Sequence, residues 1–384
     1  FSTLPISEET ARAIREVLKY NNMTMVQELA MPVCLEGVDV LARAKTGTGK
    51  TLAFLIPAIE RAARARAAAG GSLDGTSCLV ISPTRELAAQ IAKEAELLAT
   101  FHGKGRDRMT VDIAVGGACK PAADLKRFRG SPPVILVATP GRLLDHLENG
   151  GLRPMFRDLD TLVLDEADRL LDMGFKRDVE KILSSEGGGA GGRQALMFSA
   201  TLPDDVASVA SSVLASGYRT IDCIGEQEDG THAHVPQEYM VVPLEQQAAA
   251  LMALLADLIS AADGGNHKII VFFAAARLVQ LHAALAEALG LPVLETHSRK
   301  SQAHRDRVSE EFRRGRNIIM FTSDVSARGL DYPDVTTVVQ VGLPTDRAQY
   351  IHRLGRTARA GKDGRGILLL ADFERRFLKE VSDL

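Results

Sequence analysis

The sequence has few cysteines, no long apolar run and no excess of basic residues. Its four cysteines lie far apart and form no C-x-x-C pair or zinc-type cluster with histidine, which favours free thiols in a reducing compartment. The longest apolar stretches, around residues 52–59 and 269–276, are too short to cross a bilayer, so no membrane association is expected. Lysine and arginine total 46 against 49 for aspartate and glutamate, a net charge of -3, so any nucleic-acid surface has to be local.

The length and the pattern of the chain predict two α/β domains. Domains of ~100 to 200 residues imply two units in a chain of 384 residues. Short β-branched runs alternate with helical patterns throughout, which predicts βαβ units and mostly parallel sheets flanked by helices. Residues 225–236 are polar, acidic and almost free of large apolar side chains, so we expect domains at 1–224 and 237–384 joined by this linker. Strands are expected at 38–42, 78–82, 111–115, 134–138, 161–164 and 195–199, and then at 238–242, 268–273, 292–296, 317–322, 337–341 and 366–370.

A glycine-rich loop follows the first expected strand and leads into a helix-like stretch at 51–66. In this setting backbone N–H groups can wrap a polyphosphate at a positive helix N-terminus. Ala44 stands where the general phosphate-loop pattern has its first glycine, but the two later glycines still permit a tight loop. Lysine reaches the terminal phosphates and the following threonine ligates magnesium. The predicted nucleotide contacts are Thr46, Gly47, Thr48, Gly49, Lys50 and Thr51.

An acidic tetrad, Asp165-Glu166-Ala167-Asp168, follows the buried-strand pattern of residues 162–164. Carboxylates at the C-terminal end of a parallel strand lie where open α/β sheets bind ligands. Alone, the tetrad could be a solvated turn and helix N-cap. Together with the phosphate loop it predicts nucleoside triphosphate hydrolysis, with Thr51 and Asp165 holding Mg²⁺ and Glu166 orienting or deprotonating the attacking water.

With these two motifs placed, the order of the remaining segments resembles the DEAD-box RNA helicases of superfamily 2 along nearly the whole chain. The resemblance implies two tandem RecA-like domains that use ATP and Mg²⁺. Tyr20 and Gln27 resemble the family's adenine-reading Q motif, in which an amide meets the adenine edge and an aromatic ring stacks on it. Met23 and Ser298 replace a proline and a glycine that are usual in the family.

Further motifs follow from the same resemblance. Three segments of the first half are similar to RNA-backbone motifs, and Ser199 and Thr201 resemble a motif that couples to Asp168. In the second half, Asp331 is expected at the ribose. Arg356 and Arg359 are expected to project from one helical turn toward the γ-phosphate, and His352 is expected to take part in coupling. Most family members have glycine in place of Ala358. The residues expected at RNA are Pro83, Arg85, Gly116, Gly117, Thr139, Gly141, Arg142, Arg299 and Thr322.

The implied activity is RNA-stimulated ATP hydrolysis coupled to local unwinding or remodelling of RNA duplexes and ribonucleoproteins. Lys50, Asp165, Glu166, Arg356 and Arg359 are the expected catalytic set. Single-stranded or short duplex RNA would be bound through its backbone without sequence preference. The core is expected to be monomeric, with possible ribonucleoprotein or regulatory protein partners. A resemblance of residues 373–378 to nucleolar and organellar members suggests an intracellular protein of nuclear, nucleolar or organellar location.

Two other functions share these motifs. An ATP-gated RNA clamp would bind both ligands and turn over little, and no residue pattern excludes it. A DNA-directed helicase or translocase of the same superfamily is the second alternative. The Q motif and the tetrad ending in Asp168 favour RNA over DNA.

Overall fold

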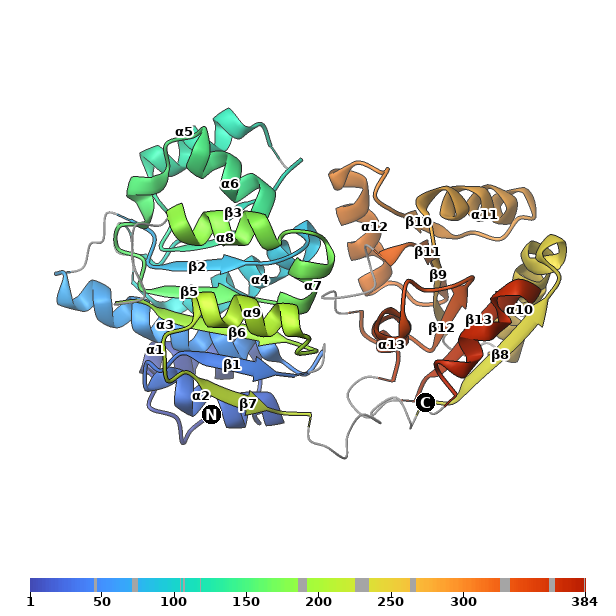
Figure 1. Cartoon of the computed structure of the whole chain (residues 1–384), viewed down its shortest axis with the longest axis horizontal. Helices are drawn as coiled ribbons and strands as arrows, with labels where there is room; N and C mark the ends of the chain where they lie inside the picture. Colours follow the sequence, from blue (N-terminus) through green and yellow to red (C-terminus); the bar gives the residue numbers. More distant parts are fainter. Residues whose placement is uncertain are drawn as a thin grey trace. The chain divides into compact units, whose positions relative to one another are not determined.

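The computed structural model divides into two compact units, Phe1–Gly225 and Glu226–Leu384 (Figure 1). It describes the chain except for residues 45–46, 71–74, 104, 106–107, 118, 186–191, 225–234, 263–266, 325–331, 359–362 and 383. The predicted linker, residues 225–236, therefore lies almost wholly outside the described residues.

The first unit is built on a sheet of seven parallel strands in the order β3-β4-β2-β5-β6-β1-β7. Six of these strands lie within two residues of the predicted positions. The seventh, β7, was not expected, because its sequence Arg-Thr-Ile-Asp is polar and lies largely exposed at the edge of the sheet. The strands are β1 Val40–Arg43, β2 Cys78–Ile81, β3 Val111–Ala114, β4 Ile135–Ala138, β5 Thr161–Leu164, β6 Gln194–Ser199 and β7 Arg219–Asp222.

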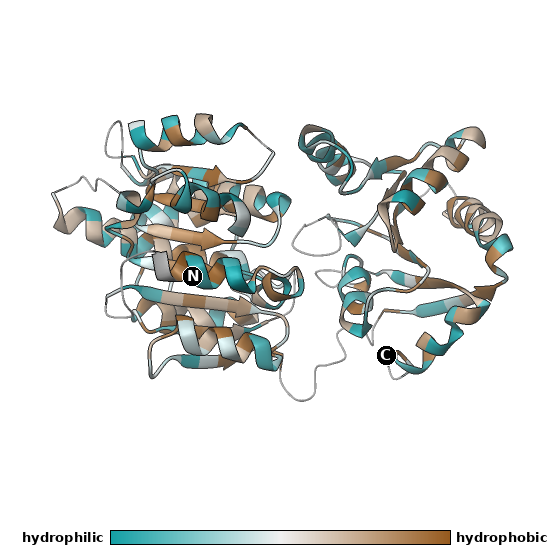
Figure 2. Cartoon of the chain, turned by 45° about the horizontal axis from the view of Figure 1, so that its top comes forward, coloured by the Kyte–Doolittle hydropathy of each residue, from teal (hydrophilic) through white to brown (hydrophobic). Residues whose placement is uncertain are grey.

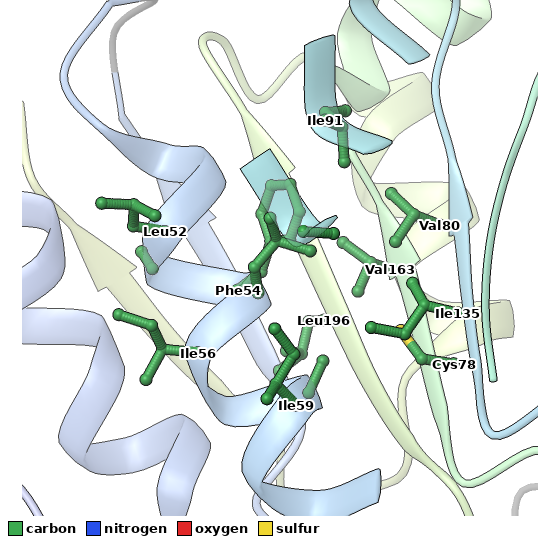
Figure 3. Packing of buried hydrophobic residues seen from close by; sticks show 14 of the residues in the cluster. Leu52, Phe54, Ile56, Ile59, Cys78, Val80, Ile91, Ile135, Val163 and Leu196 are labelled. Carbon is green, nitrogen blue, oxygen red and sulfur yellow. The ribbon is translucent and has the colours of Figure 1, made fainter. Parts of the chain in front are cut away.

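Helices cover both faces of this sheet, so its central strands are buried on both sides and read as continuous apolar runs. Helices α2, α3 and α4 pack on one face, where Phe54, Ile91 and Val163 belong to one buried apolar cluster (Figure 3). Helices α6 to α9 pack on the other face. The helices are α1 Glu8–Arg12, α2 Met25–Leu35, α3 Lys50–Ala68, α4 Arg85–Leu98, α5 Pro121–Gly130, α6 Pro140–Glu148, α7 Ala167–Asp172, α8 Lys176–Ser185 and α9 Asp204–Val213, with a π-helical turn at Ala13–Leu18 and 3-10 turns at Ala99–Phe101 and Arg153–Phe156.

The second unit has a sheet of six parallel strands in the order β10-β11-β9-β12-β13-β8. All six were predicted to within two residues. Helices α10 and α11 pack on one face of the sheet and α12 on the other, and the brown strands of Figure 2 mark the apolar layer between them. The elements are β8 Gln237–Val242, α10 Gln247–Ala261, β9 Lys268–Phe273, α11 Ala276–Ala288, β10 Leu294–Thr296, α12 Gln302–Arg314, β11 Ile318–Thr322, β12 Thr337–Val341, α13 Arg347–Leu354 and β13 Arg365–Ala371, with 3-10 turns at Leu244–Gln246 and Asp372–Lys379.

Within the described part of the chain, every helix is too short or too polar to cross a membrane.

Candidate functional site

The motifs of the first unit meet at one edge of its sheet. Because all the strands are parallel, the loops that follow them emerge at the same edge. The phosphate loop follows β1, the acidic tetrad follows β5 and the Ser199–Thr201 segment follows β6, so these three loops are neighbours. The three predicted RNA segments follow β2, β4 and β3, which form the adjoining half of the sheet. Of the three nucleotide loops, the acidic tetrad after β5 is the one next to the RNA segments, because β5 pairs with β2.

The phosphate loop ends in a glycine whose conformation allows helix α3 to begin directly after it. Gly49 is the N-cap of α3 in the left-handed region, with φ +89°, and α3 begins at Lys50. The Lys50 side chain is buried, and its Nζ donates to the carbonyl oxygen of Ala44 at 3.0 Å. Thr51 lies in the first turn of α3, where its hydroxyl suits a magnesium ion and the helix N-terminus suits the phosphate that carries the ion. Thr46 lies outside the described residues.

Gln27 connects the Q motif to this loop. Its Oε1 accepts from the backbone N–H of Thr24 at 3.0 Å, and its Nε2 donates to the carbonyl oxygen of Gly49 at 3.1 Å. Thr24 is the N-cap of α2 and forms a capping box with Gln27, a pattern that the sequence contains and that our sequence interpretation overlooked. The cap forms with Met23 in the position where the family usually has proline. Tyr20 is 52% exposed, so its ring surface is accessible for stacking.

We expect Gly49→Ala to weaken ATP binding by tenfold or more. An added Cβ would lie 2.6 Å from Gln27 Nε2 and 3.2 Å from Thr24 Oγ1, and the left-handed backbone adds ~1–2 kcal/mol of strain for alanine. Titration of a fluorescent ATP analogue measures the effect. Gly70→Ala is the matched control, because Gly70 has φ +75° but an added Cβ there meets nothing within 4 Å. Equal ATP affinity in both variants would show that the Gln27 contact is unimportant.

The acidic tetrad is buried and electrostatically strained. Burial raises the pKa of Asp165 to about 7; Lys50 opposes the shift, and the neighbouring charges of Glu166 and Asp168 add to it. Glu166 adopts a left-handed backbone, φ 47° and ψ 55°, which is uncommon for a residue with a side chain. Its buried Oε2 has no hydrogen-bond partner among the described residues, and it lies 3.6 Å from Arg169 Nη1. Strain and an unsatisfied carboxylate at one position are typical of a functional site.

These residues fit a magnesium ion held mainly by its nucleotide. Among the described residues no group of three or more histidine, cysteine or acidic side chains forms a metal cage. Mg²⁺ does not need one, because it usually takes one or two carboxylates and completes its shell with phosphate oxygens and water. The hard oxygens of Asp165 and Thr51 provide such a donor set, and the clustered carboxylates favour a cation. When bound, the ion would neutralise charge on the phosphates.

Asp168 is joined to the loop after β6 by the hydrogen bonds that the sequence predicts. Thr201 donates to Asp168 Oδ2 through its hydroxyl at 3.0 Å and its backbone N–H at 3.2 Å. Ser199 Oγ accepts from the Asp168 N–H at 3.2 Å and donates to the Thr201 carbonyl at 2.6 Å. A displacement of the tetrad would therefore be transmitted to the residues after β6. The coupling role itself stays a prediction.

Two of the predicted RNA segments are in contact. The guanidinium of Arg85 lies against the backbone of Gly116 and Gly117, so closely that a Cβ on Gly116 would lie 3.1 Å from Arg85 Nη2. Arg85 is the first residue of α4, after the buried Pro83 and the N-cap Thr84. Gly117 has φ +78° and is exposed. An Arg fork beside an exposed glycine backbone suits a phosphate.

In the third predicted RNA segment, residues 139–142, the Thr139 and Arg142 side chains are turned to other protein groups and the exposed residue is a glycine. Thr139 is the N-cap of α6 with Pro140 at its first position, and the Thr139 side chain is buried and makes no capping hydrogen bond. Gly141 is exposed in the first turn. Arg142, expected at RNA, instead donates from Nη1 to Asp124 at 2.6 Å and from Nη2 to the Cys119 carbonyl at 3.1 Å. The sequence gives no signal for this partner, because Asp124 lies on a separate helix.

In the second unit, the two residues expected at RNA differ in exposure. Arg299 is exposed, and its N–H donates to Nδ1 of the buried His297 at 3.1 Å. Thr322 is the last residue of β11 and is fully buried, with its hydroxyl donating to the Ser323 carbonyl, so its side chain is not placed for direct RNA contact. Asp331 and Arg359 lie outside the described residues.

The helical turn expected to carry Arg356 does not form at that residue, and Arg359 lies outside the described residues. Helix α13 ends at Leu354, and Ala358, between the two arginines, has a left-handed backbone with φ 53°. Arg356 lies in the turn after the helix, only 1% exposed, and its Nε donates to the carbonyl of the buried His352 at 3.3 Å. The left-handed conformation also explains why glycine is usual in place of Ala358.

We expect Ala358→Gly to stabilise the protein by up to about 1 kcal/mol. Release of left-handed strain is worth ~1–2 kcal/mol, and the greater freedom of glycine in the unfolded chain offsets part of it. Urea unfolding measures the change. Ala253→Gly, at an exposed position inside α10, should instead destabilise by about 1 kcal/mol. Destabilisation of similar size by both changes would contradict the strain at Ala358.

Comparison with known proteins agrees with this geometry. The chain matches the family model for DEAD/DEAH box helicases over residues 24–209 and that for the helicase conserved C-terminal domain over residues 249–361. It is 48% identical to DEAD-box ATP-dependent RNA helicase 26 of Oryza sativa, covering all of this chain and 69% of that protein. It is 46% identical to the Arabidopsis thaliana protein of the same name, of which it spans 44%.

Solved structures of helicases share the fold of the whole chain. A structure of Mss116p bound to single-stranded RNA and AMP-PNP matches 98% of this chain and 75% of that one, with 31% identity and a TM-score of 0.87. Dbp5 of S. cerevisiae bound to RNA and ADP BeF3 matches 100% of this chain and 94% of that one, with 25% identity and a TM-score of 0.81. The chain belongs to the DEAD-box family of ATP-dependent RNA helicases. Its two units are the tandem RecA-like domains expected from the sequence.

Proposed function

We propose that this chain hydrolyses ATP in response to RNA and uses the cycle to separate short duplexes or remodel ribonucleoproteins. The observation that supports this most directly is the shared edge of the first sheet, where the nucleotide motifs on β5, β6 and β1 adjoin the RNA segments on β3, β4 and β2. The hydrogen bonds between Asp168 and Thr201 would transmit a displacement of the acidic tetrad to the loop after β6. The relatives bound to RNA together with ATP analogues support the same pairing of ligands.

The first unit would hold the nucleotide. Lys50 would contact the terminal phosphates, Gln27 and Tyr20 the adenine, and Thr51 and Asp165 the magnesium ion. Glu166 would orient or deprotonate the attacking water, since its buried Oε2 has no hydrogen-bond partner among the described residues.

The second unit would supply the remaining charge. Arg356 and Arg359 would reach the γ-phosphate, and Asp331 the ribose, only when nucleotide and RNA bring the two units together. Phosphoryl transfer depends mainly on positioning and charge neutralisation, so each unit alone would be inactive. RNA that favours the closed arrangement would tighten ATP binding, and ATP would tighten RNA binding by the same factor.

The test is phosphate release by the full chain with no nucleic acid, with single-stranded RNA and with DNA of the same sequence. We expect RNA to raise turnover at least tenfold and DNA to have little effect. Equal rates in all three conditions would refute the proposed function. Tight binding of ATP and RNA with negligible turnover would identify an RNA clamp, and equal stimulation by DNA would identify a DNA-directed enzyme.

A further inference from the structure

A buried carboxylate lies between two of the RNA segments of the first unit. Asp124, on α5, has a side chain that is only 1% exposed. It accepts hydrogen bonds from Arg142 Nη1 at 2.6 Å, Cys119 Sγ at 2.7 Å and Arg127 Nη2 at 2.9 Å, and it lies 3.2 Å from His146 Nε2. These four partners come from α5, α6 and the loop after Gly117, so a single carboxylate joins three segments of the chain.

The cluster requires an ionised carboxylate. Burial acts to raise the pKa of Asp124, but hydrogen bonds from Cys119 and His146 and the charges of Arg127 and Arg142 outweigh it and hold the pKa below its ordinary value. Every neighbour in contact with the carboxylate donates to it, and His146 can do so as its Nε2–H tautomer. An asparagine amide in place of the carboxylate would have one acceptor oxygen fewer, and its NH₂ group would face some of these donors.

The cluster holds the RNA segments at a fixed spacing. Cys119 follows Gly117 by two positions, and Arg142 directly follows Gly141. The Asp124 cluster therefore contacts the chain close to the end of both RNA segments. Arg142 uses two nitrogens of its guanidinium fork, one on Asp124 and one on the Cys119 carbonyl, which ties α6 to the loop after β3. A planar fork can make this double contact, whereas a lysine ammonium cannot make it with the same geometry.

We propose that Asp124 is a positioning residue for RNA: through Arg142 and Cys119 it sets the distance between the backbone groups of Gly116–Gly117 and those of Thr139–Gly141. A flexible strand can then contact both segments without reordering the protein, which preserves affinity. This inference rests on the proposed function, because it assumes that RNA binds at these segments. Asp124 would affect RNA binding and would take no part in the hydrolysis of ATP.

The test separates RNA affinity from turnover in Asp124→Asn, which has nearly the same shape. ATPase activity is titrated with single-stranded RNA. We expect the RNA concentration for half-maximal stimulation to rise about tenfold, while the rate at saturating RNA and the KM for ATP stay within twofold of the unaltered chain. Arg142→Lys keeps the charge but loses the double contact, and it should shift the RNA titration similarly. The combined variant should shift it no further than the larger single effect, because both act through one contact.

Lys126→Gln is the matched control. Lys126 is an exposed basic residue of the same helix, and it is not one of the four partners of Asp124. It should leave the RNA titration unchanged. An unchanged RNA titration in folded Asp124→Asn and in Arg142→Lys, or additive effects of the two, would overturn the inference. A fall in maximal rate matching the loss of RNA affinity would indicate a merely structural role. If the unaltered chain shows no RNA stimulation, the proposed function fails instead.

Discussion

Replacing Arg356 by glutamine is expected to lower RNA-stimulated ATP turnover by about 10³- to 10⁵-fold, the range over which an arginine finger acts in related chemistry. The guanidinium would neutralise charge that develops on the γ-phosphate, and glutamine has no charge to replace it. ATP affinity should change little, because this interaction is made mainly in the transition state. Phosphate release at saturating ATP and RNA measures turnover, and a fluorescent ATP analogue measures binding.

The burial of Arg356 makes a folding control necessary. Its side chain is 1% exposed, so a loss of activity is informative only if the variant has a normal unfolding midpoint. Arg316→Gln provides a matched control, because Arg316 is an exposed arginine of the second unit. It should retain full turnover. Normal turnover in folded Arg356→Gln would remove this arginine from the catalytic set.

Strands and local motifs were predictable from the sequence because each leaves a local pattern. Buried parallel strands are mostly apolar along their length, and the bounds of β5, β9 and β12 were predicted without error. The loop after β5 lies at the same edge of the first sheet as the loops after β1 and β6, since parallel pairing brings the carboxyl ends of these strands together. The exposed edge strand β7 has no such pattern. One half-buried isoleucine between polar residues does not distinguish a strand from a loop.

Parts of the site that depend on distant side chains were not predictable. Nothing near Arg142 indicates that Asp124 will be its partner, and Thr322 becomes fully buried only when its strand enters a sheet. The spacing of Arg356 and Arg359 suggested a helical turn, but α13 ends at Leu354 and the chain takes a left-handed conformation at Ala358. The left-handed conformation depends on how the residues after α13 pack against the rest of the unit, and the spacing of two arginines carries no information about that packing.

Replacing Asp165 by asparagine should abolish magnesium-dependent turnover and at the same time stabilise the nucleotide-free protein. Burial and the neighbouring carboxylates raise the pKa of Asp165 from 3.8 to about 7. Between these pH values the folded chain keeps a proton that the unfolded chain has released, so this residue lowers stability as pH rises through the interval. Above about pH 7 the penalty is fully present, on the order of 2–4 kcal/mol. Asparagine carries no charge to bury, and Lys50 keeps its hydrogen bond to Ala44.

The pH dependence separates this explanation from a general change in packing. At pH 8 the unfolding midpoint of Asp165→Asn should exceed that of the unaltered chain by roughly 5–10 °C, whereas near pH 4 the difference should largely vanish. Differential scanning fluorimetry without nucleotide measures both. Asp158→Asn, at an exposed position, should show neither effect. A gain of equal size at both pH values would point to packing, and no gain at pH 8 would show that the ionised Asp165 is not strained. A stability gain joined to a loss of turnover would mean that this fold retains a destabilising carboxylate because magnesium binding requires it.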